Sequence, residues 1–317
     1  MPVLDRTNLS GLIPEPVTRE ILQGAIAEST VLRLGRRLPN MSSKTQKINV
    51  LDSLPTAYFV GAEPTNSDEG QAALKKTTNM AWANKTIYAE EVAVIVPIPE
   101  AVLDDADYDI WGEVRPRLTE AFGKVIDAAV LYGTNAPSTW RSSIVASATA
   151  SSNTVTATSD VFADIMDVNG LISLVETDGY IPNAVAAAIS MRGKLRGLRD
   201  NDLQPIFKTD MQGSTRYALD GMDVYFPNNG AFDPTQSLMI VGDWSQLVYA
   251  IRQDMTFKIF TEGVIQDPTS GDIVYNLMQN DMVALRAVMR LGWEVANPVN
   301  AMNAGNATAF PFAVYKP

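Results

Sequence analysis

The stretch that decides the fold is Asp281-Met-Val-Ala-Leu-Arg-Ala-Val-Met-Arg-Leu-Gly-Trp-Glu-Val295, in which apolar side chains occupy every second position. Successive side chains of a β-strand point to opposite faces, so the pattern predicts one long strand with an apolar face and a charged face. The apolar face holds Val283, Leu285, Ala287, Met289, Leu291, Trp293 and Val295, and the other face holds Arg286, Arg290 and Glu294. At about 3.3 Å per residue the strand runs on the order of 40 Å, which is typical of an elongated protein rather than a compact enzyme domain.

The composition excludes the usual inventory of enzyme sites. The chain has 317 residues, 46% of them hydrophobic and 19% charged, which is enough for a folded protein with a real core. It contains no cysteine and no histidine, so it has no disulfide, no thiol nucleophile, no imidazole base and no Cys/His zinc site. We therefore predict a non-enzymatic protein without catalytic, cofactor-binding or metal-binding residues. An enzyme that uses a carboxylate or serine site is the rival interpretation.

The net charge of −11 argues against a protein that grips nucleic acid. Such proteins carry a basic face or tail, whereas the densest basic cluster here is the short group Arg33, Arg36 and Arg37. No apolar run approaches the roughly 20 residues of a membrane span, and Met1 is not followed by an apolar signal segment. These features predict a protein that is kept in a cytosol-like compartment and has no membrane partner.

Residues 1–50 have the pattern of an arm. A helix is predicted over 17–34, with Thr18 as its N-cap, and an extended piece over 46–51. The apolar side of the helix carries Ile21, Leu22, Ala25 and Ile26. One helix with extended flanks buries little of itself, so the arm either packs on its own domain or lies on a neighbouring subunit.

A long flap is predicted next. Residues 54–60 and 85–96 are expected to form strands, and the polar stretch 61–79 between them is too long for a tight hairpin turn. An isolated two-stranded ribbon is marginally stable in water and needs a partner surface. The alternative is a surface loop without fixed structure.

The strongest predicted helix runs from Asp109 to a stop at Gly133, about 24 residues or roughly 36 Å. Pro116 lies inside it and predicts a kink or a delayed start. We expect Leu118, Phe122 and Val125 on this helix to cover Leu285, Met289, Leu291 and Trp293 of the long strand. Helix capping and solvation explain Asp104, Asp105, Asp107 and Asp109 better than a metal site does.

The remaining segments alternate between short helices and strands. A surface loop or small hairpin is predicted over 134–164, helices over 162–176 and 191–198, and a tail over 300–317. Strands are predicted over 184–189, 224–226, 238–242, 247–252 and 255–260. The basic residues Arg192, Lys194, Arg196 and Arg199 precede Asp200 and Asp202, which favours local ion pairs or a subunit contact over a phosphate site.

In their order, these segments resemble the major capsid protein of tailed bacteriophages, the Hong Kong-97 phage type. Four stretches carry the resemblance: Thr56 to Glu63, Val92 to Asp105, Leu238 to Gln246, and Asn280 to Pro298. They are similar to the start of the family's extended loop, the strand leading to its spine helix, its Gly-Asp turn, and its last long strand with an Asn-Pro exit. Each stretch is unspecific alone, whereas four in the correct order are specific.

The resemblance implies an α+β subunit with six segments. They are an N-terminal arm (1–50), an extended loop (51–96), a peripheral domain with the spine helix (97–136), an axial domain (137–252), the return strands of the peripheral domain (253–300) and a C-terminal tail (301–317).

The resemblance also implies a function. Copies of the chain are expected to assemble as pentamers and hexamers into the icosahedral shell of a virion, formed in the host cytoplasm. The shell encloses double-stranded DNA without sequence-specific binding, and an acidic inner wall would let that DNA slide. Scaffolding, portal and decoration proteins are the further partners implied. The alternative is an encapsulin-type nanocompartment shell protein, which uses the same fold around a protein cargo.

Two departures from the family pattern concern the arm and the loop. Some relatives carry a scaffolding region ahead of the arm, whereas here the arm begins almost at Met1, so scaffolding is expected from a separate protein or from a removed propiece. Some relatives also cross-link a loop lysine to an asparagine of another subunit. Lys75, Lys76 and Lys85 lie in or near the loop, but no partner asparagine can be placed, and solvation or ion pairing is the expected role of these lysines.

Overall fold

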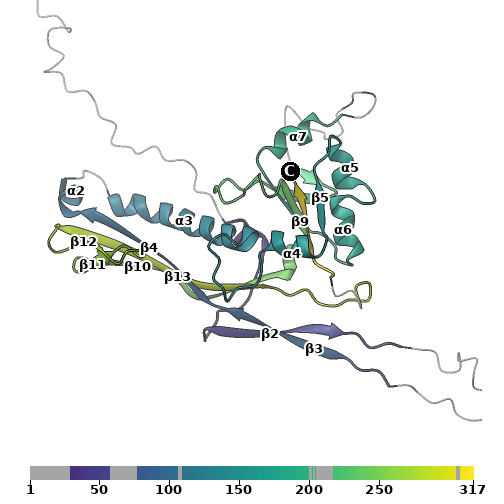
Figure 1. Cartoon of the computed structure of the whole chain (residues 1–317), viewed down its shortest axis with the longest axis horizontal. Helices are drawn as coiled ribbons and strands as arrows, with labels where there is room; N and C mark the ends of the chain where they lie inside the picture. Colours follow the sequence, from purple (N-terminus) through teal and green to yellow (C-terminus); the bar gives the residue numbers. More distant parts are fainter. Residues whose placement is uncertain are drawn as a thin grey trace, which may run out of the picture.

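The computed structural model describes residues 29–57, 77–105, 109–199, 202, 204, 217–304 and 308–317. Figure 1 shows two bodies, one in which the long helix α3 lies along long strands and a rounder one in which shorter helices surround a second sheet. A two-stranded ribbon, β2 and β3, projects below the first body in this view. Separate sheets with helices packed on them make this an α+β fold, as predicted. Within the described residues, no helix combines the length and apolarity that crossing a bilayer requires.

The first sheet is built on the long strand predicted at 281–295. This strand, β13, is 14 residues long and pairs antiparallel with a neighbour on each side. The strand order is β1-β10-β13-β4, with bounds Arg36–Arg37, Leu247–Phe260, Met282–Val295 and Glu90–Pro99. The two strands predicted over 247–252 and 255–260 are in fact the single strand β10, and register shifts between Ile251 and Thr256 absorb the break in the pattern.

The two faces of β13 differ less than the sequence indicates. All seven residues of the predicted apolar face are buried. On the opposite face Ala284, Val288 and Gly292 are buried as well, so only the charged residues between them reach water. The charged face predicted for this strand is therefore only partly solvated.

Helix α3 (Ile110–Tyr132) covers the apolar face of this sheet, as predicted. It is continuous through Pro116, so there is no delayed start, and Gly133 ends it in the left-handed conformation at φ 77°. Leu118 and Phe122 are buried in one cluster with the residues of β13. Val125, which we also expected there, is 46% exposed, and Ile126 takes the buried position instead. The short helix α2 (Glu100–Asp105) precedes α3.

A six-stranded sheet forms the second body, in the order β5-β14-β9-β6-β8-β7. Its strands are Thr154–Thr156, Phe312–Lys316, Met239–Gly242, Ala184–Ala187, Met222–Tyr225 and Ala218–Leu219. Helices α5 (Val161–Met166), α6 (Leu171–Thr177) and α7 (Met191–Gly197) accompany it. The helix predicted over 162–176 is thus broken in two. The break lies around Gly170, which is the N-cap of α6 in extended conformation.

The predicted tail at 300–317 is wrong in its last part. Phe312–Lys316 forms β14, which pairs with β9 on one side and β5 on the other. From Phe312 to Tyr315 every side chain is buried. Pro311 and the asparagines before it make this strand hard to predict from the sequence, because the apolar run Phe312–Tyr315 is only four residues long.

The predicted loop over 134–164 contains the helix α4 (Ile144–Ala150). Ser143 caps it by accepting a hydrogen bond from the Ala146 N–H at 3.3 Å, and Ile144 and Ala148 are fully buried. The Ser/Thr/Ala composition of this segment resembles a loop, but tertiary burial of one helix face stabilises α4.

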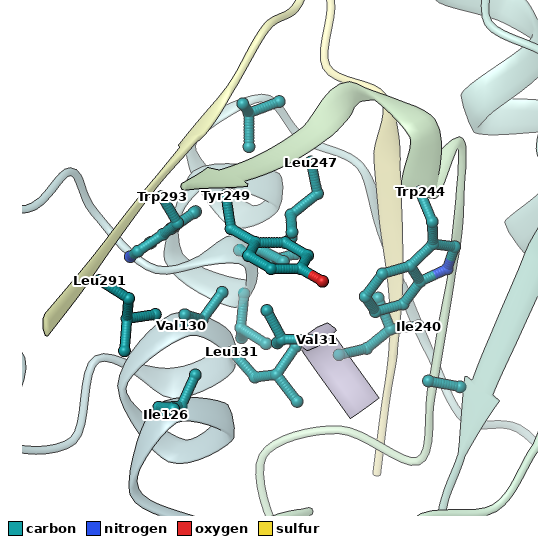
Figure 2. Close-up of a cluster of buried hydrophobic side chains, with 14 of the residues drawn as sticks. Val31, Ile126, Val130, Leu131, Ile240, Trp244, Leu247, Tyr249, Leu291 and Trp293 are labelled. Carbon is teal, nitrogen blue, oxygen red and sulfur yellow. The ribbon is translucent and has the colours of Figure 1, made fainter. Parts of the chain in front are cut away.

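One hydrophobic core joins the two bodies (Figure 2). It draws on α3, β13 and β10 from the first body and on β9 and the turn after it from the second. The labelled members are Val31, Ile126, Val130, Leu131, Ile240, Trp244, Leu247, Tyr249, Leu291 and Trp293. Because side chains of both bodies share one close-packed cluster, the position of one body on the other is set by packing.

The ribbon consists of β2 (Thr45–Ser53) and β3 (Ala81–Tyr88), paired antiparallel. The predicted extended piece at 46–51 belongs to β2. Residues 54–57, expected to start the next strand, carry no strand, and residues 58–60 lie outside the described part. The strand predicted over 85–96 is divided at Ala89 between β3 of the ribbon and β4 of the first sheet. A second, small hairpin is formed by β11 (Val264–Gln266) and β12 (Ile273–Asn276).

Candidate assembly surfaces

Among the described residues no three acidic side chains stand close enough to hold a metal ion. Asp104 and Asp105 end α2, Asp109 is the N-cap residue of α3 but makes no side-chain capping bond, and Asp107 lies outside the described part. Three structural features could serve assembly: the root of the arm, the ribbon with its root, and the contacts between the two bodies.

The arm root is a short helix, α1 (Thr30–Leu34), with Ser29 as its N-cap. Ser29 has extended backbone angles, φ −67° and ψ 130°, so the helix predicted over 17–34 does not run unbroken to Leu34. The predicted cap Thr18 and the segment up to residue 28 lie outside the described residues. Thr30 and Val31 are fully buried against their own subunit, so this part of the arm packs on its own domain.

Asp127 of α3 holds the arm root in place. Its Oδ1 accepts hydrogen bonds from the Ser29 hydroxyl at 2.6 Å and the Val31 N–H at 3.0 Å. Its Oδ2 accepts from the Thr30 N–H at 2.7 Å and from the Asn229 side-chain amide at 2.6 Å. Arm, spine helix and a loop of the second body therefore meet on one buried carboxylate.

Burial raises the pKa of Asp127 above its ordinary value, and the four hydrogen bonds oppose that rise. A buried carboxylate is costly unless its oxygens are satisfied, and here both oxygens are. The arm root is thus fixed by a group whose loss would leave several buried donors without a partner. The sequence alone shows no sign of this, because the partners lie about a hundred positions away.

The ribbon exposes apolar side chains. Trp82 is 59% exposed, Met80 50% and Tyr88 37%. In Figure 1 the ribbon extends away from both bodies. A two-stranded ribbon that presents large apolar groups to water is the kind of surface that a partner covers.

The root of the ribbon is pressed against the long strand. A side chain at Gly292 would collide with the Tyr88 carbonyl oxygen, so only glycine lets β3 cross β13 this closely. The Lys85 ammonium donates to the Val295 carbonyl at 2.9 Å, beside the ion pair of Arg141 and Glu294 at 2.7 Å. Burial lowers the pKa of Lys85, while Glu294 opposes that shift. Lys85 is therefore engaged within its own subunit, and Lys75 and Lys76 lie outside the described residues.

The basic cluster of α7 contacts rings and carbonyl groups. The Arg192 guanidinium lies 4.6 Å from the Tyr217 ring centroid and 5.4 Å from that of Phe226. Arg196 and Arg199 donate to backbone carbonyls of α7 and the residue after it. Of the two expected acidic partners, Asp200 lies outside the described part. The contacts seen here do not form a phosphate site.

The Asn-Pro stretch after β13, Asn297 and Pro298, connects the two bodies through hydrogen bonds. The Tyr180 hydroxyl donates to Asn297 Oδ1 and accepts from the Asn303 amide at 2.9 Å. Asn297 also donates to the Ala309 carbonyl at 3.0 Å and adopts a positive φ of 45°. In the Gly-Asp stretch, Asp243 accepts from the Ser245 N–H and from the Asn183 amide, which fixes the turn after β9.

Comparison with known proteins identifies the family of the chain. The profile described as "Phage capsid family" matches residues 10–306. The chain belongs to the phage capsid family. It is 28% identical over 289 residues to the major capsid protein of Staphylococcus phage 80alpha, which covers 90% of this chain and 82% of that relative.

Solved structures agree with the family assignment. A chain from Microbacterium phage Oxtober96 is 34% identical, with 100% of both chains covered and a TM-score of 0.84. A chain from Mycobacterium phage Adephagia is 30% identical, covers 100% of this chain and 98% of that one, and gives a TM-score of 0.82. The capsid of a native GTA particle, at 17% identity and a TM-score of 0.64, shares the fold.

The protein is thus a phage major capsid protein with the Hong Kong-97 type of fold. Its function is structural: copies of it form the icosahedral shell of a tailed phage, and its place is the virion capsid. This confirms the function, the non-enzymatic class and the fold that the resemblance implied.

Proposed function

We propose that the ribbon β2–β3 of each subunit lies across a neighbouring subunit, and that the subunits associate as pentamers and hexamers around double-stranded DNA. The exposed Trp82 on the ribbon is the observation that carries this proposal. Its burial by a neighbour would remove a large aromatic surface from water, and aromatic anchors of this kind dominate interface energies.

The segment division follows the family pattern with two adjustments. We assign 97–136 and 253–300 to the peripheral domain and 137–252 to the axial domain. The ribbon begins at Thr45, inside the range 1–50 expected for the arm, so we move the start of the extended loop to Thr45. β14 lies inside the second sheet, so we assign Phe312–Lys316 to the axial domain instead of to a tail.

The enclosed DNA is held by confinement in this proposal. A net charge of −11 disfavours close contact between the shell and phosphate groups. Scaffolding, portal and decoration proteins complete the set of partners.

Replacement of Trp82 by Ser tests the ribbon contact. The side chain is exposed in the subunit, so the free energy of unfolding should change by less than about 0.5 kcal/mol. The yield of closed shells, counted by electron microscopy and sedimentation, should fall several-fold. Trp82→Phe keeps an apolar ring and should restore assembly. Normal shells from Trp82→Ser would refute the contact, while the fold and family assignment would stand.

A further inference from the structure

An apolar cavity of about 590 Å³ lies between the arm root, α3 and β10. Its apolar walls include Leu32, Phe122, Met255, Phe257 and Met289. The volume is in the range of cavities that hold a ligand or several apolar side chains. Arg33, Arg37 and Asp254 also line it and place charges beside the apolar walls.

The arm enters the body at the wall of this cavity. Ser29 is itself a lining residue, and Asp127 fixes it through the hydrogen bonds of the arm root. Ser29 also lies directly on α3, since a side chain at Gly123 would meet it at 3.4 Å. The residues before Ser29 therefore begin at the cavity rather than at a distant point of the surface.

The segment that precedes Ser29 has a matching composition. Residues 17–28 read Val-Thr-Arg-Glu-Ile-Leu-Gln-Gly-Ala-Ile-Ala-Glu, with apolar residues at helical spacing. Glu20 and Glu28 flank the apolar positions and complement Arg33 and Arg37 of the lining. The short covalent link to Ser29 gives the segment a high effective concentration at the cavity, above that of any segment from another subunit.

We propose that residues 17–28 of each subunit dock their apolar side chains, Ile21, Leu22, Ala25 and Ile26, in the cavity of the same subunit. This goes beyond the function proposed above, because it divides the arm. Residues 17–34 serve their own subunit, and residues 1–16 alone are left to reach a neighbour.

Disulfide cross-linking tests the proposal. Because the chain has no native cysteine, only the introduced pair can form a disulfide. The pair Ile26→Cys with Thr119→Cys joins the segment to an exposed lining residue on α3. The matched control is Ile26→Cys with Val125→Cys. Val125 is exposed on the same helix but lines a different cavity. Met255→Cys, whose native sulfur lies 3.7 Å from the Thr119 hydroxyl, is a second lining position should the first pair disturb folding.

Assembled shells of each pair are oxidised mildly and analysed by non-reducing electrophoresis and mass spectrometry of the linked peptides. We expect an intrachain disulfide for the Thr119 and Met255 pairs, several-fold above that of the Val125 pair. Interchain dimers would show that a neighbour's segment fills the cavity and would overturn the proposal. Equal or absent cross-linking in all pairs would overturn it as well. Shell formation itself is scored separately, so the proposed ribbon contact is not affected by either result.

Discussion

Trp293 and Asp127 are two buried side chains of the first body. The Trp293 indole is 2% exposed and meets Trp140 edge to face, with 6.3 Å between ring centroids. Arg290, next to it on the opposite face, forms an ion pair with Glu91 at 2.5 Å, in which both side chains are partly exposed. Apolar packing is therefore continuous on one face of β13, whereas on the other face buried residues alternate with solvent-screened charges.

Trp293→Ala should lower the free energy of unfolding by about 3–5 kcal/mol, as expected for a large aromatic side chain removed from a packed core. Arg290→Ala is the control from the opposite face and should cost at most about 1 kcal/mol, because water screens its ion pair. Urea unfolding of the free subunits measures both. Wild-type stability of Trp293→Ala would show that β13 is not a core strand.

Asp127→Asn should loosen the arm root. The asparagine amide keeps one acceptor oxygen, but its N–H₂ group faces N–H or O–H donors from which the carboxylate accepts hydrogen bonds. The lost bonds should lower the free energy of unfolding by about 1–3 kcal/mol. Hydrogen exchange over residues 29–35 should accelerate, whereas exchange in the second sheet should not. Asp109→Asn on the same helix is the control, because Asp109 makes no side-chain capping bond. Unchanged exchange at 29–35 in Asp127→Asn would mean that the arm root is held by packing alone.

Among the helices and strands, those with one continuously buried face can be predicted from the sequence. Those that are stabilised by contacts with residues far away in the sequence cannot. The alternation in β13 and the spacing in α3 are sufficient because β13 has one face buried over its whole length and α3 has one face buried from Leu118 onward. α4 escaped prediction because its stability comes from burying Ile144 and Ala148 under other elements. The division at Ala89 between β3 and β4 could not be predicted either, because the apolar pattern continues where the chain passes from the ribbon to the first sheet. The network on Asp127 links residues too far apart in sequence for any local pattern to record.

Deletions of the arm should affect folding and assembly differently, depending on the last residue that is removed. Removal of residues 1–28 leaves Ser29 and the bonds to Asp127 intact, so the subunit should still fold, losing only the stability that the docked residues 17–28 contribute, and should lose the ability to close shells. Removal of residues 1–34 also takes away the fully buried Val31 and the partners of Asp127, so several kcal/mol of stability should be lost. Circular dichroism and electron microscopy separate the two effects. Normal shells from the 1–28 deletion would show that this segment has no part in assembly.

At the scale of the whole molecule, the two bodies are joined by the shared core and by two tyrosine hydroxyls. Tyr132 of α3 shares a hydrogen bond of 2.8 Å with Ser237 and accepts from the Asp233 N–H, both in the second body. Tyr180 of the second body bonds the Asn-Pro stretch after β13. Burial raises the pKa of Tyr132 to about 12, and burial likewise raises the pKa of Tyr180 to about 12.

These shifts predict a loss of stability in alkali. A tyrosine whose pKa is raised by folding contributes its full stability below pH 10, its value in the unfolded chain, and loses it as the pH rises through 12. Unfolding free energies measured from pH 8 upward should therefore decline most steeply in that window. Tyr180→Phe should cost about 1 kcal/mol at pH 8 and flatten the decline. Tyr275→Phe, at a partly exposed hairpin position, is the control, and an equal flattening there would refute the assignment.

β14 lies between β5 and β9, yet translation produces it after every other strand of that sheet. While the ribosome still holds this segment, the nascent chain has β5 without a partner and β9 with an open edge. Phe312 also belongs to the core between the bodies, so that core is incomplete until the same residues have emerged. We therefore expect a subunit to become competent for the shell only after residues 312–316 have left the ribosome, so the order of synthesis keeps half-made copies out of a growing particle.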